Sequence, residues 1–88
     1  MPNPEAPDVR LKRLHMRSIR RGIKEMDLIL SKFSDRQLHH LTGEELDVYE
    51  ALLNENDQDL LGWVTGQFPP EEKYKQLILK IESTALQP

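Results

Sequence analysis

The chain has 88 residues, of which 38% are hydrophobic and 31% are charged, and its formal net charge is −3. It contains no cysteine, which excludes a disulfide scaffold, a thiolate zinc site and a cysteine nucleophile. A chain this short forms one modest hydrophobic core, so a shallow protein-binding face is easier to build than a deep enzyme cleft. No apolar run approaches the roughly 20 residues that a membrane-spanning helix needs.

Residues 1–8 are expected to form a disordered N-terminal arm. The segment holds three prolines and two acidic residues and has no apolar stretch. It therefore resembles neither a secretory signal, which needs an apolar region, nor a transit peptide, which avoids acids. We expect a cytoplasmic protein with a single helical domain at residues 9–83 and a frayed tail at residues 84–88.

The charges are distributed unevenly along the chain. Seven basic residues and no acid lie within residues 10–24. Residues 25–72, by contrast, contain twelve acids and only two basic residues. The folded molecule is therefore expected to be electrically polarised.

The first two predicted helices meet near Gly22. Apolar residues at helical spacing predict a helix over residues 9–21, which Gly22 would end by adopting the left-handed conformation. A second apolar stripe begins at Met26 and predicts a helix that continues to about His40.

The next two helices are marked by capping residues. Thr42 and Glu45 have the spacing of a capping box, so a helix should begin there. Asn56 or Asp57 can cap a fourth helix, which Gly66 would end.

The last predicted helix has Pro70 at its first position, where a missing N–H is tolerated. The period-two alternation of a half-buried strand is absent from the chain. The pattern therefore predicts an all-α protein, a compact five-helix bundle with short loops.

Catalytic, metal and cofactor sites find little support in the residues. His15 and Ser18 lie three positions apart and could form a base–nucleophile pair, but an ordinary serine is the better interpretation. His39 and His40 are adjacent, so on a helix their side chains point about 100° apart and cannot share a metal ion. The isolated glycines form no phosphate-binding loop. We therefore expect no enzymatic activity, no metal and no cofactor of the chain's own.

Nucleic-acid binding is the main alternative to protein binding. Seven basic residues on one helix could neutralise several phosphates. The acidic helices that follow would be repelled by DNA, however, and a recognition helix is not evident. A nucleic-acid partner is therefore not our first expectation. Nucleic-acid binding, or an antitoxin-like regulatory role of the same helix, stays the alternative.

The segment at residues 21–25, Arg-Gly-Ile-Lys-Glu, is the candidate functional centre. In a continuous helix Arg21 and Glu25 would form a routine ion pair worth a few tenths of a kcal/mol. Gly22 opposes this interpretation, because a glycine within a helix costs about 1 kcal/mol relative to alanine. If Gly22 instead forms a turn, Arg21 and Glu25 flank a corner that exposes a cation, an anion and bare backbone. A partner protein could approach such a corner closely.

Two blocks of the sequence resemble a known family. Residues 17–33 contain Arg-Gly-x-x-Glu with an aspartate two positions later, and residues 57–66 read Asp-Gln-Asp-Leu-Leu-Gly-Trp-Val-Thr-Gly. Together with residues 49–53, they resemble the succinate dehydrogenase assembly factors that promote covalent flavinylation. The resemblance extends over residues 10–81, and the combination of blocks is more specific than Arg-Gly-x-x-Glu alone.

The resemblance implies a five-helix fold and a non-enzymatic assembly factor. Members of this family bind the flavoprotein subunit of succinate dehydrogenase and in some cases that of fumarate reductase. They assist covalent attachment of FAD to a histidine of that subunit, so FAD would be fixed on the partner. We further expect a monomer, and the apparent lack of a transit peptide indicates a bacterial member.

The resemblance also implies a binding face for the partner. Two residues, Arg17 and Arg20, are added to it from charge and proximity. The positions that match the motif are Arg21, Gly22, Glu25 and Asp27.

Overall fold

A computed structural model describes residues 6–19 and 21–87. Within these ranges the chain forms five α-helices and two short 3₁₀-helices, and it contains no strand. The helices are α1 (Pro7–Ser18), α2 (Lys24–Gln37), α3 (Gly43–Leu52), α4 (Asp57–Thr65) and α5 (Lys75–Ala85), and the 3₁₀-helices are η1 (Leu38–His40) and η2 (Glu72–Tyr74). The predicted all-α fold with five helices is confirmed.

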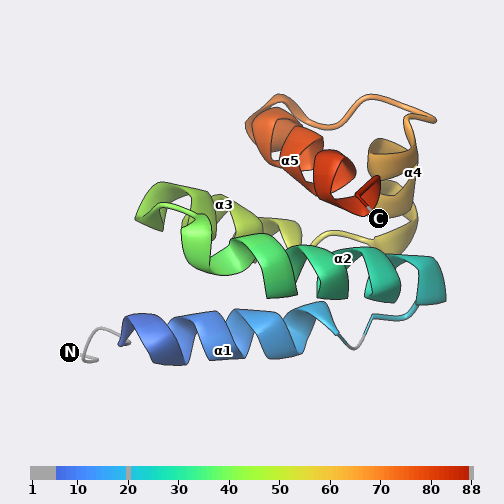
Figure 1. Cartoon of the computed structure of the whole chain (residues 1–88). Coiled ribbons are helices and arrows are strands. Elements are labelled where there is room, and N and C mark those ends of the chain that lie inside the picture. The colour runs from blue at the N-terminus through green and yellow to red at the C-terminus, as the bar shows by residue number, and fades with distance from the viewer. Residues whose placement is uncertain (1–5, 20, 88) are drawn as a thin grey trace.

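The helices enclose one core around α2. Helices α1 and α2 run antiparallel along one side of the molecule, and α5 lies across the other side of α2 (Figure 1). Three fully buried residues at helical spacing, Met26, Leu30 and Phe33, give α2 its inner face. The other helices each add apolar side chains to the same cluster, among them Leu14, Leu52, Leu60 and Ile81. Because this core uses every helix, it fixes the relative position of the segments that join them.

Local signals place the starts of α3 and α4 and the end of α4 as predicted. Thr42 accepts a hydrogen bond from the Glu45 backbone N–H (3.1 Å), while the Glu45 carboxylate accepts one from the Thr42 N–H (2.9 Å). This is the complete capping box. Asn56 caps α4 by accepting from the Gln58 N–H (2.8 Å). Gly66 ends α4 in the left-handed conformation, with φ of 80°.

The end of the first helix differs from the prediction. Helix α1 begins at Pro7 and ends at Ser18, and Gly22 does not adopt a positive φ, which within the described residues only Gly66 does. The reason is a tertiary contact: the Gly22 N–H donates to the Asp57 carboxylate of α4 (2.8 Å) and so does not close a helix end. The backbone beyond Gly22 is extended at Ile23 (φ −115°, ψ 126°). Gly22 therefore lies in a linker and does not terminate a helix.

Three other boundaries also shift. Helix α2 stops at Gln37 and continues to His40 only as the 3₁₀-helix η1. Pro70 is not the first residue of a helix, because the chain stays extended until η2 begins at Glu72. Helix α5 continues through Thr84, which is 2% exposed and donates a hydrogen bond to the Lys80 carbonyl (3.0 Å). The expected N-terminal arm lies mostly outside the described residues, and its last part, Pro7 onward, is the first turn of α1.

Candidate functional site

The candidate site is the corner, residues 21–25, which joins α1 to α2 (Figure 1). Its first residue, Arg21, turns inward, and its side chain is only 11% exposed. The guanidinium contacts the Asp57 Oδ1 atom through Nε (2.8 Å) and Nη2 (2.6 Å). It also donates to the carbonyl oxygens of Leu53 (2.9 Å) and Glu55 (3.3 Å). Arg21 thus ties the corner to the connection between α3 and α4.

The backbone of the corner is held by the same carboxylate. The Gly22 N–H donates to the other oxygen of Asp57, Oδ2, over 2.8 Å. A Cβ atom added at Gly22 would lie 3.4 Å from this oxygen, at the limit of ordinary van der Waals contact. Gly22 itself is exposed. A larger side chain there would crowd the Asp57 carboxylate or protrude over the corner.

The expectation of an exposed cation at Arg21 is wrong. The sequence predicts that Arg21 and Glu25 flank the corner and present opposite charges to a partner. Instead the Arg21 guanidinium pairs with Asp57, which lies 36 positions away in the sequence and is itself only 16% exposed. The exposed groups of the corner are Gly22, Lys24 and Glu25.

The remaining predicted site residues have different surroundings. Asp27 is half-buried, and its Oδ1 atom is buried without a hydrogen-bond partner among the described residues. Arg17 donates to the Asn54 side chain (2.6 Å) in the connection between α3 and α4. Arg20 lies outside the described residues. The structure therefore brings Gly22, Glu25 and Asp27 together at the start of α2.

The three arginines of α1 face acidic and polar residues of the chain itself. Arg10 pairs with Asp47 (2.6 Å), and both Arg10 (3.4 Å) and Arg13 (3.0 Å) contact Glu50. Hydrogen bonds from Arg13 hold the pKa of Glu50 below its ordinary value. We call this row of contacts the α1 seam. Its members are Arg10, Arg13, Arg17 and Arg21 on one side and Asp47, Glu50, Asn54 and Asp57 on the other.

The candidate catalytic pair of His15 and Ser18 does not form. Ser18 is fully buried and donates to the Leu14 carbonyl (2.7 Å), so the Tyr49 hydroxyl donates to the Ser18 Oγ atom (2.6 Å). Burial raises the pKa of Tyr49 to about 12. His15 instead contacts Ser34 through its Nδ1 atom (2.6 Å). Ser18 therefore has a structural role in joining α1 to α3.

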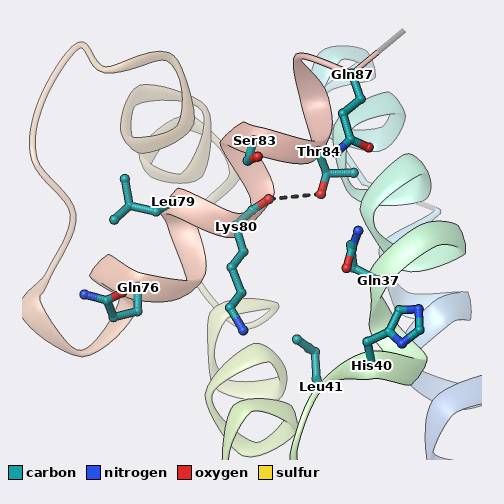
Figure 2. A pocket seen from close by; sticks show the side chains of 9 residues that line it. All are labelled: Gln37, His40, Leu41, Gln76, Leu79, Lys80, Ser83, Thr84 and Gln87. Carbon is teal, nitrogen blue, oxygen red and sulfur yellow. Dashed lines mark hydrogen bonds between the residues drawn. The ribbon is translucent and has the colours of Figure 1, made fainter.

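A separate hollow of about 340 Å³ lies between η1 and α5. Figure 2 shows Gln37, His40 and Lys80 around this hollow, together with the hydrogen bond from Thr84 to the Lys80 carbonyl. The Lys80 ammonium is paired with Glu45, so the cation of this hollow is already neutralised. Over residues 6–19 and 21–87 the histidines and carboxylates form no cluster that could hold a metal ion. In the same ranges, no helix combines the length and the apolar character required to cross a membrane.

A match to a known family includes the corner and all of the α1 seam except Arg10. A family model described as flavinator of succinate dehydrogenase matches residues 12–85. The mitochondrial succinate dehydrogenase assembly factor 2 of Candida glabrata is 46% identical over 74 residues, which are 81% of this chain and 48% of the relative. That of Debaryomyces hansenii is 43% identical over 81 residues, 88% of this chain and 57% of the relative.

A more distant relative extends the same likeness to insects. The mitochondrial succinate dehydrogenase assembly factor 2-A of Drosophila persimilis is 34% identical over 90 residues, which cover 92% of this chain and 56% of the relative. The chain thus spans about half the length of the curated relatives it matches.

Proposed function

The chain belongs to the family of flavinators of succinate dehydrogenase, and we propose that it binds the flavoprotein subunit of succinate dehydrogenase and promotes covalent attachment of FAD to that subunit. The observation that carries this proposal is the family match over residues 12–85, which includes every helix in full except α1, whose first five residues it omits. The name of the relatives, succinate dehydrogenase assembly factor, supports it. The flavoprotein of fumarate reductase is a further proposed partner.

The proposed mechanism requires no catalytic group of this chain. The chemistry of flavin attachment belongs to the cofactor and to the histidine that receives it, both on the partner. A helper protein accelerates such a reaction when it favours the partner conformation in which the reacting atoms are aligned. A rigid face of complementary charge is sufficient for this task.

We propose that this face is formed by the start of α2 with its neighbours. Glu25 is exposed in the first turn of α2, where it can accept hydrogen bonds from an arginine or from backbone N–H groups of the partner. Asp27 is half-buried in the same turn, and because its Oδ1 atom is buried, only the remaining accessible part of its side chain can meet the partner. Gly22 allows close approach because it has no side chain. The proposed face consists of Arg17, Arg20, Arg21, Gly22, Glu25 and Asp27, in which Arg21 supports the corner from the inside.

The test is a purified reaction that contains the flavoprotein without covalent flavin, FAD and this chain. Covalent flavin is measured as protein-bound fluorescence after denaturation. We expect Glu25→Ala and Gly22→Arg to lower both subunit binding and flavin attachment. Loss of a charged hydrogen bond in Glu25→Ala should cost at least about tenfold, and in Gly22→Arg the added side chain would block close approach of the partner. Glu44→Ala is the control, because Glu44 is an exposed acid of α3 outside the proposed face. If both corner variants bind and act like the wild type, the corner is not the site.

The same proposal is tested in cells by deletion of the gene. Loss of covalent flavin on the succinate dehydrogenase flavoprotein is the expected result, and unchanged covalent flavin would contradict it. The relatives are named as mitochondrial proteins. For this chain we propose the bacterial cytoplasm, which its lack of cysteine fits. Cell fractionation checks the compartment, and light scattering during gel filtration checks the proposed monomeric state.

A further inference from the structure

We propose that Asp57 is a positioning residue, whose carboxylate holds the corner in the conformation that binds the flavoprotein. This inference rests on the proposed function for the identity of the partner. It adds Asp57, which begins α4 and the sequence block 57–66, to the functional residues of the Arg-Gly-x-x-Glu motif. Asp57 itself need not touch the partner, because it acts through Arg21 and Gly22.

Both oxygens of the Asp57 carboxylate are engaged by neighbouring residues of the corner. Oδ1 receives the Arg21 guanidinium at 2.6 and 2.8 Å, and Oδ2 receives the Gly22 N–H at 2.8 Å. One side chain therefore fixes both the direction of a neighbouring side chain and the orientation of the next peptide. These charge-assisted hydrogen bonds are strong because all the groups except the Gly22 backbone are mostly shielded from water.

The middle of the corner depends most on this contact. Arg21 is also held by the Leu53 and Glu55 carbonyls and Ile23 packs against the core, whereas the Gly22 N–H is held by Asp57. Residues 21–23 are not helical, and Ile23, the N-cap of α2, makes no side-chain capping hydrogen bond. Without the carboxylate, the corner would sample several conformations, of which only a fraction could bind. If only a fraction of the molecules has a binding-competent corner, the apparent affinity for the partner is weakened in proportion to that fraction.

Helix α4 does not need the Asp57 carboxylate for its cap, which is supplied by Asn56. A substitution at Asp57 therefore removes the contact to the corner while the start of α4 keeps its capping residue. A negative charge in the first turn of a helix contributes only a modest favourable interaction with the helix dipole. The role of Asp57 in the corner can for this reason be separated from its role in α4.

The experiment compares Asp57→Ala and Asp57→Asn with Glu50→Ala. Glu50 lies in the same α1 seam, but its carboxylate binds Arg10 and Arg13 of α1, whereas that of Asp57 binds Arg21 of the corner. Hydrogen exchange of the Gly22 amide is measured in the free chain, well below the unfolding temperature. Affinity for the flavoprotein and the rate of flavin attachment at saturating chain concentration are measured separately.

We expect Asp57→Ala to speed Gly22 exchange and to weaken affinity, each roughly tenfold or more, while the rate at saturation stays near that of the wild type. Asp57→Asn keeps one acceptor oxygen and should have a smaller effect on both. Glu50→Ala should lower the unfolding temperature without changing Gly22 exchange or affinity. This pattern separates positioning from general stability, because destabilisation alone would affect Glu50→Ala as well.

Unchanged Gly22 exchange in both Asp57 variants would overturn the proposal. Faster exchange with unchanged affinity would overturn it too, because the corner would then not limit binding. If Asp57→Ala does not fold, Asp57→Asn decides the question. A wild-type chain that fails to raise covalent flavin would refute the proposed function, whereas Gly22 exchange would still report on the contact between Asp57 and the corner.

Discussion

Gly62 shows how a missing side chain can determine local packing. A Cβ atom at this position in α4 would lie 2.2 Å from the ring of Phe68, far inside contact distance. The Phe68 N–H also donates a hydrogen bond to the Gly62 carbonyl (3.4 Å), so both the ring and the backbone of Phe68 contact Gly62 near the end of α4. We expect Gly62→Ala to displace the ring and lower the free energy of unfolding by about 1–2 kcal/mol, despite the better helix propensity of alanine.

Urea unfolding measures this effect, and two variants serve as controls. Gly43→Ala, where an added Cβ meets no atom within 4 Å, should be neutral or stabilising. Phe68→Ala should cost less in the Gly62→Ala background than in the wild type, because the ring has already been displaced there. Equal costs of Phe68→Ala in both backgrounds would show that the ring does not pack on Gly62.

The buried hydroxyl of Tyr49 makes a pH-dependent contribution to stability. Burial raises its pKa from the ordinary value of 10.0 to about 12. Below pH 10 the hydroxyl is protonated in both states, and its contribution is fully present. Between pH 10 and pH 12 the unfolded chain loses the proton first, so stability falls by up to about 2–3 kcal/mol.

Tyr49→Phe isolates this contribution because phenylalanine cannot titrate. Urea unfolding from pH 9 to pH 11.5 should show a shallower loss of stability for the variant than for the wild type. Some loss should remain, since the pKa of Tyr74 is also raised to about 12, mainly by burial. Parallel curves for the two proteins would show that Tyr49 titrates equally in the folded and unfolded chain.

The residues of the corner show what a single sequence reveals about a site. The motif around Gly22 can be recognised, and Gly22 and Glu25 are exposed as expected. The partner of Arg21 cannot be found, because Asp57 is 36 positions away and local spacing says nothing about contacts across that distance. One signal is present in the sequence: basic positions on the first helix and acidic or polar positions further along recur with similar spacings of three and four.

At the scale of elements, the α1 seam joins α1 to α3 through charged side chains. The Glu50 side chain is 34% exposed, and its carboxylate accepts a hydrogen bond from Arg13 that lowers its pKa. A lowered pKa in the folded state means that the stabilisation is present above the ordinary pKa of 4.5 and is lost as the pH falls through the folded value. Because the pair is partly exposed, we expect Glu50→Gln to cost only about 0.5–1 kcal/mol at pH 7.

A double-mutant cycle with Arg13→Gln tests this pair. The coupling energy between the two substitutions should be favourable at pH 7, smaller in 1 M salt, and close to zero below the folded pKa of Glu50. Unfolding free energies in urea at pH 7 and at a series of lower pH values supply the comparison. A coupling energy that does not change with pH would mean that the charge of Glu50 is not what joins the helices.

The helix ends are predicted well wherever the signal is local. The capping box at Thr42, the Asn56 cap and the left-handed Gly66 each involve hydrogen bonds or torsions within a few residues. Two predictions are wrong: that Gly22 ends the first helix and that Pro70 begins the last one. Glycine and proline mark helix ends but are also common in extended linkers, so the residue type alone does not decide between the two. At Gly22 the decisive contact comes from α4, and at Pro70 the extended chain continues to η2. Distant contacts of this kind override local propensity.

At the scale of the whole molecule, the charge map shows that part of the basic charge of residues 10–24 is paired with acids of the same chain. The net charge is −3, and four basic residues of α1 and the corner lie against acidic or polar side chains of the chain itself. A phosphate backbone would have to displace those contacts before it could form its own. Composition alone cannot show this, because it counts the cations without their partners.

The resulting prediction is weak binding to nucleic acids. A labelled DNA duplex at about 150 mM salt should show no saturable anisotropy change with micromolar wild-type chain, since Arg10, Arg13 and Arg21 already lie against acids of the chain. A variant that combines Asp47→Asn and Glu50→Gln removes two negative charges that lie against Arg10 and Arg13, and it should bind more tightly. Its affinity should also fall more steeply with salt: the slope of log affinity against log salt concentration should become more negative by about one for each additional phosphate that the arginines neutralise. Equal affinity and slope for both proteins would show that the α1 seam does not neutralise the basic helix.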